Sequence, residues 1–253
     1  MITTTRFDQL TVEIYESNRL LGIAAAAVFA NLVTQAVAAQ GETAVILATG
    51  NSQLTFIDAL HEHPDIPWQH ISIFHMDEYL GMSASHPASF YGFMKTRLEA
   101  AFHPKTLYGI QGDAPDYAAE MTRYTELLRQ HQPVLTVMGI GENGHLAFND
   151  PPADFHTDAL IHVVTLDDVC RRQQVGEGHF GTLDDVPRQA LSLTIPALLN
   201  TKHVLTLAPE SRKAKIVRAV LHDPVSENCP ASILRTQPHA RLLLDRESAA
   251  LSL

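Results

Sequence analysis

VLTVMGIGENGHLAFNDPP, residues 134–152, joins an apolar run to a loop too rich in glycine to be a plain helix or strand. The run at its start is typical of a strand buried on both faces. Glycines such as Gly141 and Gly144 then let the backbone fold tightly around something small. His145 can exchange protons near neutral pH, and Asp150 follows closely enough to share a pocket with it. A lone histidine in such a turn is more often an ordinary surface residue, so the flanking sequence has to decide between these interpretations.

The flanking sequence alternates between strand and helix patterns. Short apolar runs predict strands within residues 43–50, 71–80, 134–141, 159–166, 190–195, 203–209 and 240–245. Helical spacing predicts helices over residues 17–40, 54–63, 88–102, 117–131 and 211–222, the first capped by Ser17 or Asn18 and stopped by Gly41. This order predicts one domain over residues 1–253 with a three-layer α/β/α, Rossmann-like, doubly wound fold. We expect a mostly parallel sheet of about seven strands, with the active site at the C-terminal edge of the strands.

Composition narrows the classes of function. The chain has 253 residues, 45% of them hydrophobic, and a formal net charge of −10, which argues against nucleic-acid or anionic-membrane binding. Cys170 and Cys229 stand far apart and predict neither a disulfide framework nor a thiolate zinc site. We see no signal peptide, and the longest apolar run is interrupted by Asn31 before it reaches the roughly 18 residues of a membrane span. These features predict a cytoplasmic protein with a small-molecule partner.

Polar residues follow the first two predicted strands where each one ends. Thr49, Gly50, Asn51 and Ser52 form a loop that could be a phosphate nest or simply an N-capping turn. Residues 77 and 78 are adjacent acids, which could be a solvated strand end or could place a carboxylate over a substrate as a base.

Two other groups of polar residues have competing interpretations. Lys213, at a later strand-to-helix junction, could close on a bound phosphate or lie in the solvated first turn of a helix. His61 and His63 flank an acid before a proline, but no second cluster stands at ligand spacing. We therefore expect a solvated turn there and no metal site.

Together these segments resemble one family over essentially the whole chain. The motifs are ATGNS (48–52), MDEYLG (76–81), GIGENGHLAFNDP (139–151), SRKA (211–214) and PASIL (230–234), in order. They look like the glucosamine-6-phosphate deaminases, also called glucosamine-6-phosphate isomerases. That family converts an amino-sugar 6-phosphate and water to a ketose 6-phosphate and ammonia with no cofactor.

The resemblance implies a role for each matched residue. Asp77 moves a proton between C2 and C1 of the opened sugar, and His145 assists ring opening. The residues expected to orient this histidine are Asn143 and Asp150. The resemblance places these residues around the substrate and its phosphate: Thr49, Gly50, Asn51, Ser52, Glu78, Gly141, Gly144, His179 and Lys213.

The sequence departs from the family pattern at several of these positions. Asn51 replaces a smaller residue, and Asp150 stands where a glutamate is expected, so the backbone must shift or contact with His145 is lost. His179 matches a phosphate-binding arginine, with Arg171 and Arg172 as alternatives. If His179 holds phosphate, binding should weaken as its imidazole deprotonates, roughly above pH 6.5.

Other interpretations stay open. The galactosamine epimer, giving tagatose 6-phosphate, is a close second substrate. Hydrolysis of 6-phosphogluconolactone is less favoured, because residues 77–79 read DEY and 147–151 read AFNDP. A non-catalytic sugar-phosphate sensor would leave Asp77 and His145 without a role. No strong allosteric activation is expected, and the sequence leaves the oligomeric state open.

Overall fold

The structure, a computed structural model that describes residues 1–252, is organised around an eight-stranded sheet. Its strand order is β1-β2-β11-β10-β7-β3-β4-β6, and every neighbouring pair is parallel except the β1–β2 hairpin. The strands are β1 (Thr3–Phe7), β2 (Leu10–Tyr15), β3 (Thr43–Leu47), β4 (Ile71–His75), β6 (Thr106–Tyr108), β7 (Leu135–Met138), β10 (His203–Ala208) and β11 (Ala240–Asp245). From β3 the chain continues to β4 and β6 on one side of the sheet, whereas from β7 it continues to β10 and β11 on the other side. The strand order therefore reverses between β3 and β7.

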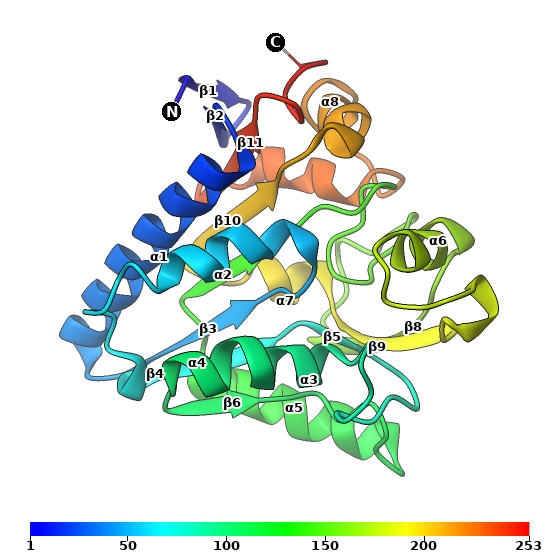
Figure 1. Cartoon of the computed structure of the whole chain (residues 1–253). Coiled ribbons are helices and arrows are strands. Elements are labelled where there is room, and N and C mark those ends of the chain that lie inside the picture. Colours follow the sequence, from blue (N-terminus) through cyan, green and yellow to red (C-terminus); the bar gives the residue numbers. More distant parts are fainter. Residues whose placement is uncertain (253) are drawn as a thin grey trace.

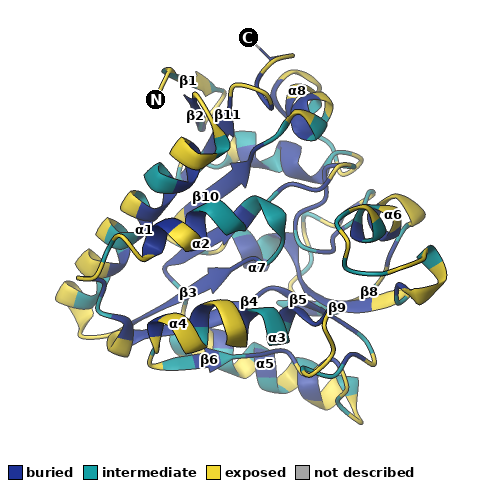
Figure 2. Ribbon diagram, in the orientation of Figure 1, coloured by how far each residue is buried: buried dark blue, intermediate teal, exposed yellow. Residues whose placement is uncertain are grey.

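Helices cover both faces of this sheet, which confirms the three-layer α/β/α prediction (Figure 1). One face packs against α1 (Asn18–Gln40), α2 (Leu54–Leu60), α3 (Phe90–Met94) and α4 (Ala100–Phe102), the last two joined by a π-helical segment, Lys95–Glu99. The other face packs against α5 (Tyr117–His131), α7 (Ile195–Leu199) and α8 (Ala214–His222). Figure 2 shows the sheet buried while the outer helix faces are exposed. The buried strands therefore carry apolar residues on both faces.

Helix α1 matches its prediction closely. Ser17 accepts a hydrogen bond from the Leu20 amide at 3.3 Å, and Gly41 ends the helix at a φ of 83°. By length and hydropathy this helix could cross a membrane. However, its face that includes Leu21, Phe29 and Val33 is buried in the hydrophobic core. We interpret α1 as a core helix.

Three of the predicted strands lie elsewhere than expected. The predicted strand at 71–80 divides at Met76 into β4 and β5 (Asp77–Tyr79). β5 pairs antiparallel with β9 (Gln189–Leu193), which pairs with β8 (Ile161–Thr165) in a separate three-stranded sheet. The predicted strands at 159–166 and 190–195 therefore exist but are not part of the parallel sheet. This small sheet and α6 (Asp168–Gly176) lie beyond the carboxyl ends of the main strands (Figure 1).

The main sheet has eight strands, close to the seven expected, but its members differ from the predicted ones. β1, β2 and β6 belong to the main sheet but were not predicted, and neither were helices α6 and α7. β1 has five residues that alternate between partly buried and exposed, and β6 has only three residues. Strands this short show too little alternation to be recognised from the sequence. β2 carries the polar Glu13 in its buried run, where it pairs with Arg241 of β11 at 2.6 Å.

We expect Gly22→Ala in α1 to lower the free energy of unfolding by about 1–3 kcal/mol, as overpacking typically does. A Cβ at Gly22 would lie 2.5 Å from the backbone carbonyl carbon of Thr55 in α2. Gly176→Ala at the end of α6 is the matched control, because nothing lies within 4 Å of its Cβ position. Urea unfolding of both variants tests this, and equal stability of the two would contradict the packing argument.

Candidate functional site

The loops that follow β3, β4, β7 and β10 enclose a cleft at the carboxyl edge of the sheet, where its strand order reverses. Ligands of doubly wound folds bind at this location. The cleft has an empty volume of about 620 Å³, open to solvent, within the usual size range of small-molecule sites. Its lining includes Thr49, Gly50, Asn51, Ser52, Asp77, Gly141, His145, Gln174, Glu177, His179, Arg212 and Lys213.

Asp77 is the carboxylate that faces this cleft. It follows β4 directly, and its backbone pairs with Ser192 of β9, so the small sheet fixes its position. Only 7% of the residue is exposed. Burial, reinforced by the charge of Glu78, raises the pKa of Asp77 to about 8. A carboxylate in this setting can hold a proton at neutral pH and exchange it with a bound ligand.

Glu78 is not among the residues that line the cleft, so the predicted contact with substrate stays a prediction. Its carboxylate accepts hydrogen bonds from the Ser89 hydroxyl at 2.6 Å and from the Tyr91 and Tyr79 amides at 2.9 and 3.0 Å. It therefore ties β5 to the first turn of α3. Both adjacent acids are buried, and Glu78 can be because it finds its donors inside the protein.

His145 faces the same cleft from the loop after β7. A Cβ at residue 141 would lie 2.2 Å from its Nε2, so only glycine leaves room for the imidazole there. The Gly141 amide donates to the His145 carbonyl at 2.9 Å and closes the loop around the ring. Gly144, by contrast, lies against Ile216 and Cys229 and is not among the residues that line the cleft, so its predicted substrate contact stays a prediction. Its φ of 90° shows that it shapes the loop.

Asp150 keeps its contact with His145 despite being shorter than glutamate. Its Oδ1 lies 3.1 Å from His145 Nδ1 and also accepts from Asn143 Nδ2 at 2.9 Å. Burial opposes ionisation, but the hydrogen bonds from His145, Asn143 and the Asp167 amide keep the pKa of Asp150 below its usual range. An ionised Asp150 favours the tautomer with the proton on Nδ1, which leaves His145 Nε2 free to act in the cleft.

Asn143 and Asp167 support this pair without lining the cleft. Asn143 Nδ2 donates to both Asp150 and Asp167 Oδ2, at 2.9 and 3.0 Å, and its Oδ1 accepts from the His145 amide. Asp167 also caps α6 by accepting from the Cys170 amide at 2.6 Å. Asp167 lies outside the motifs quoted above. It reaches Asn143 and Asp150 from a separate segment of the chain, so its role could not be seen from the sequence.

His145, Asp150 and Cys170 place potential metal ligands within 4.8 Å of one another. Burial raises the pKa of the Cys170 thiol, which favours its protonated form beside Asp150. The Asp150 oxygens are already used by protein donors. The cluster therefore fits a hydrogen-bonded support for His145 better than a cation site.

The other end of the cleft carries the residues expected to hold phosphate. Thr49, Gly50, Asn51 and Ser52 line it, Gly50 at a φ of 93°. Lys213 is 3% exposed, and burial, with the neighbouring Arg212 charge, lowers its pKa to about 8. His179 also lines this end, and its Nε2 has no hydrogen-bond partner among residues 1–252.

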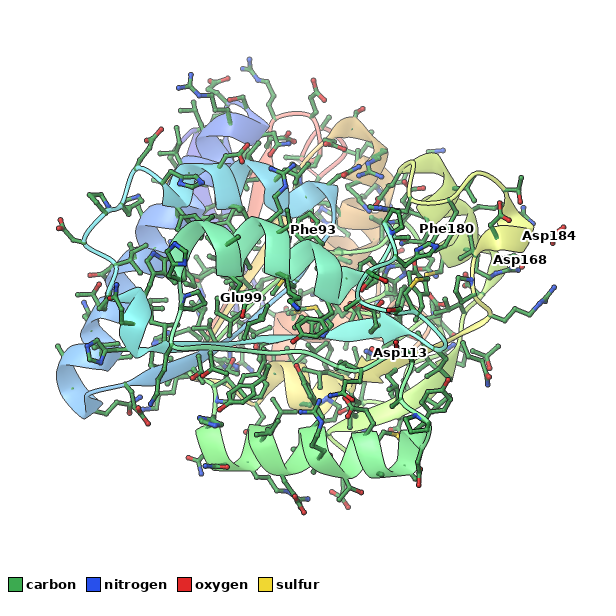
Figure 3. The ribbon with its side chains drawn as sticks, turned by 60° about the horizontal axis from the view of Figure 1, so that its bottom comes forward. Phe93, Glu99, Asp113, Asp168, Phe180 and Asp184 are labelled. Carbon is green, nitrogen blue, oxygen red and sulfur yellow. The ribbon has the colours of Figure 1, made fainter. Side chains whose placement is uncertain are left out.

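Arg171 and Arg172, the alternatives to His179, lie outside the cleft. Arg171 is buried and donates to the Leu183 and Val186 carbonyls at 2.6 and 3.1 Å, while Arg172 is exposed near Asp168. Figure 3 shows the labelled Asp168 and Phe180 in the segment beyond the sheet that carries α6. The cleft arginine is instead Arg212, which the sequence analysis passed over in the SRKA motif. Glu177 and Gln174 were also missed, because the prediction contained no helix at α6.

Comparison with known proteins agrees with this site. A family model for glucosamine-6-phosphate isomerases/6-phosphogluconolactonase matches residues 16–243. A glucosamine-6-phosphate deaminase of Listeria welshimeri is 36% identical over 81% of this chain and 86% of that protein. One from Exiguobacterium sibiricum is 35% identical over 81% and 79% of the two chains.

Solved structures give the same result. The structure of a monomeric glucosamine-6-phosphate deaminase superposes with a TM-score of 0.85 at 31% identity, covering 95% of this chain and 99% of that one. The 6-phosphogluconolactonase of Trypanosoma brucei shares the fold with a TM-score of 0.77 over 99% and 100% of the chains, at 17% identity. The chain therefore belongs to the family of glucosamine-6-phosphate isomerases and 6-phosphogluconolactonases.

Proposed function

We propose that this protein is a glucosamine-6-phosphate deaminase, which converts glucosamine 6-phosphate and water to fructose 6-phosphate and ammonia without a cofactor. One observation carries the proposal: a buried carboxylate, Asp77, and an acid-supported imidazole, His145, face one cleft whose far end holds cations. The named relatives above act on this substrate. We also propose a cytoplasmic location, where free thiols such as those of Cys170 and Cys229 remain reduced.

The proposed reaction assigns a proton transfer to each group. His145 Nε2 helps move a proton between the anomeric hydroxyl and the ring oxygen, which opens the sugar. Asp77 then takes the proton from C2 and delivers it to C1, while a proton passes from the substrate's ammonium group to the C1 oxygen, leaving an iminium at C2. Water adds at C2 and ammonia leaves, which completes the ketose. Binding of the remote phosphate supplies energy that positions C1 and C2 over Asp77.

Lactone hydrolysis is the second candidate, since lactonases share the fold. That reaction attacks a carbonyl carbon with water and removes no proton from carbon. Asp77 could act as a base in either reaction, so the preference for the deaminase rests on the named relatives, which are 35–36% identical to this chain.

Ammonia release from glucosamine 6-phosphate and, in parallel, galactosamine 6-phosphate tests the proposal. Release from the first assigns the epimer, and release only from the second corrects it. Asp77→Asn serves as the control for contaminating activity. Absence of ammonia from both sugars sinks the proposal, and 6-phosphogluconolactone then becomes the substrate to assay.

We expect kcat/KM to rise with pH up to about pH 8, because the base in the free protein must be ionised to take the C2 proton, and to fall above it as Lys213 loses its charge. Asp77 is protonated below its raised pKa, so acidification removes the active form. A pH series of initial rates at low substrate measures this. A flat profile from about pH 6 to about pH 9, a range that includes this pKa, would exclude Asp77 as the titrating base.

A further inference from the structure

Arg212 pairs with three carboxylates at the cleft through its Nε and Nη1. Its Nε donates to Glu210 at 2.8 Å, and its Nη1 donates to Glu177 at 2.8 Å and lies 3.4 Å from Glu142. Glu210 lies two residues before Arg212, whereas the tertiary structure brings Glu142 and Glu177 to the same guanidinium from other segments of the chain. Arg212 nevertheless lines the cleft beside Lys213 and the loop Gly50–Ser52.

Glu177 is the least exposed of these acids. Its side chain is 8% exposed, compared with 39% for both Glu142 and Glu210. Besides Arg212, its Oε1 accepts from Gln173 Nε2 at 2.9 Å, while its Oε2 lies 3.6 Å from His179 Nε2. Burial opposes ionisation, but His179 and Arg212 lower the pKa of Glu177 to about 2. A full negative charge therefore lines the phosphate end of the cleft.

The charges at this end leave little net attraction for an anion. Arg212 and Lys213 contribute two positive charges, and the three surrounding carboxylates offset them. Among residues 1–252, Lys213 Nζ and Arg212 Nη2 have no protein hydrogen-bond partner, so both can donate to a phosphate. A phosphate dianion that binds there must share Arg212 with Glu177, and close like charges cost free energy in a poorly solvated site.

We propose that Glu177 is a specificity-determining counterion that holds Arg212 in the free protein and limits how tightly the cleft binds the phosphate group of its substrate. This inference rests on the proposed function only in taking phosphate as the ligand. Replacing a residue that binds phosphate weakens phosphate binding. Removing the charge of Glu177 should instead tighten it.

Calorimetric titration with inorganic phosphate at fixed pH and ionic strength tests this directly. Glu177→Gln keeps an acceptor for Gln173 and Arg212 but removes the charge, and we expect Kd to fall about tenfold, the scale of close charge coupling. Glu142→Gln is the matched control: the same chemical change at an exposed, longer contact should alter Kd less than about threefold. Unchanged or weaker binding to Glu177→Gln overturns the proposal.

A double-mutant cycle identifies the partner. Arg212→Met should weaken phosphate binding, and adding Glu177→Gln to it should give less than half of the tightening seen in the wild-type background. Equal tightening in both backgrounds overturns the assignment to Arg212. If Glu177→Gln does not fold, Glu177→Ala serves as the second variant, since loss of charge should act in the same direction.

Kinetics supply an independent measurement. If ammonia release is found, Glu177→Gln should lower KM for the sugar phosphate, because tighter binding of the phosphate stabilises the enzyme–substrate complex. A fall in kcat without a fall in KM contradicts the proposal. The phosphate titration requires no turnover, so failure of the deaminase assignment and failure of the Glu177 proposal give different results.

Discussion

Replacing Asp77 by asparagine is expected to reduce ammonia release by at least about a thousandfold and, at the same time, to stabilise the protein at alkaline pH. Asparagine has nearly the same shape as aspartate but cannot accept the C2 proton. The loss should appear in kcat, because the change removes a group that acts in the transition state. Loss of deuterium from C2-deuterated substrate into water, followed by NMR, isolates this step.

The stability change follows from the direction of the pKa shift. Folding raises the pKa of Asp77 from 3.8 to about 8, so the stability that the protonated carboxyl contributes is present below pH 3.8 and lost as pH rises through 8. Asparagine stays neutral and avoids this loss. We expect the variant to be more stable than wild type by at least about 1 kcal/mol above pH 8, with the difference shrinking toward pH 4.

Thermal unfolding at several pH values measures this second effect. An inactive variant that is less stable at alkaline pH would show that Asp77 is stabilised as a carboxylate, contrary to the burial argument. An active variant would remove Asp77 from the mechanism altogether. Activity and stability moving in opposite directions is the result expected of a functional group held in an unfavourable environment.

His145→Gln is expected to lower kcat by about 10²–10⁴-fold, the usual contribution of a positioned acid–base group. Glutamine can still form hydrogen bonds but cannot carry a proton between the anomeric hydroxyl and the ring oxygen. His61→Gln is the matched control, because His61 lies at the end of α2, exposed and outside the cleft. It should leave kcat unchanged.

Asp150→Asn tests how His145 is supported. The Asp150 carboxylate accepts from His145 Nδ1 at 3.1 Å, and an amide there can instead donate and favour the opposite tautomer. We therefore expect kcat to fall in the same direction as in His145→Gln, by at least about tenfold. Equal activity of Asp150→Asn and wild type would show that this contact does not set the tautomer.

The sequence alone determined the fold class, the position of the cleft and nine of the twenty residues that line it. These properties depend on local patterns: the cap at Ser17 and stop at Gly41, apolar runs that form buried strands, and polar residues at the ends of those runs. Since parallel strands present their carboxyl ends at one edge, Asp77, His145 and Lys213 could be brought together without coordinates.

The tertiary structure decided what those patterns do not encode. β5 pairs with β9 outside the main sheet, and this pairing directs Asp77 to the cleft. Glu78 points elsewhere and accepts hydrogen bonds from Ser89 and Tyr91 at the start of α3. Arg212 lines the cleft and pairs there with Glu142 and Glu177, which come from other segments of the chain. Such outcomes depend on long-range pairing and side-chain direction, which are fixed only when packed elements satisfy every buried charge and hydrogen bond together.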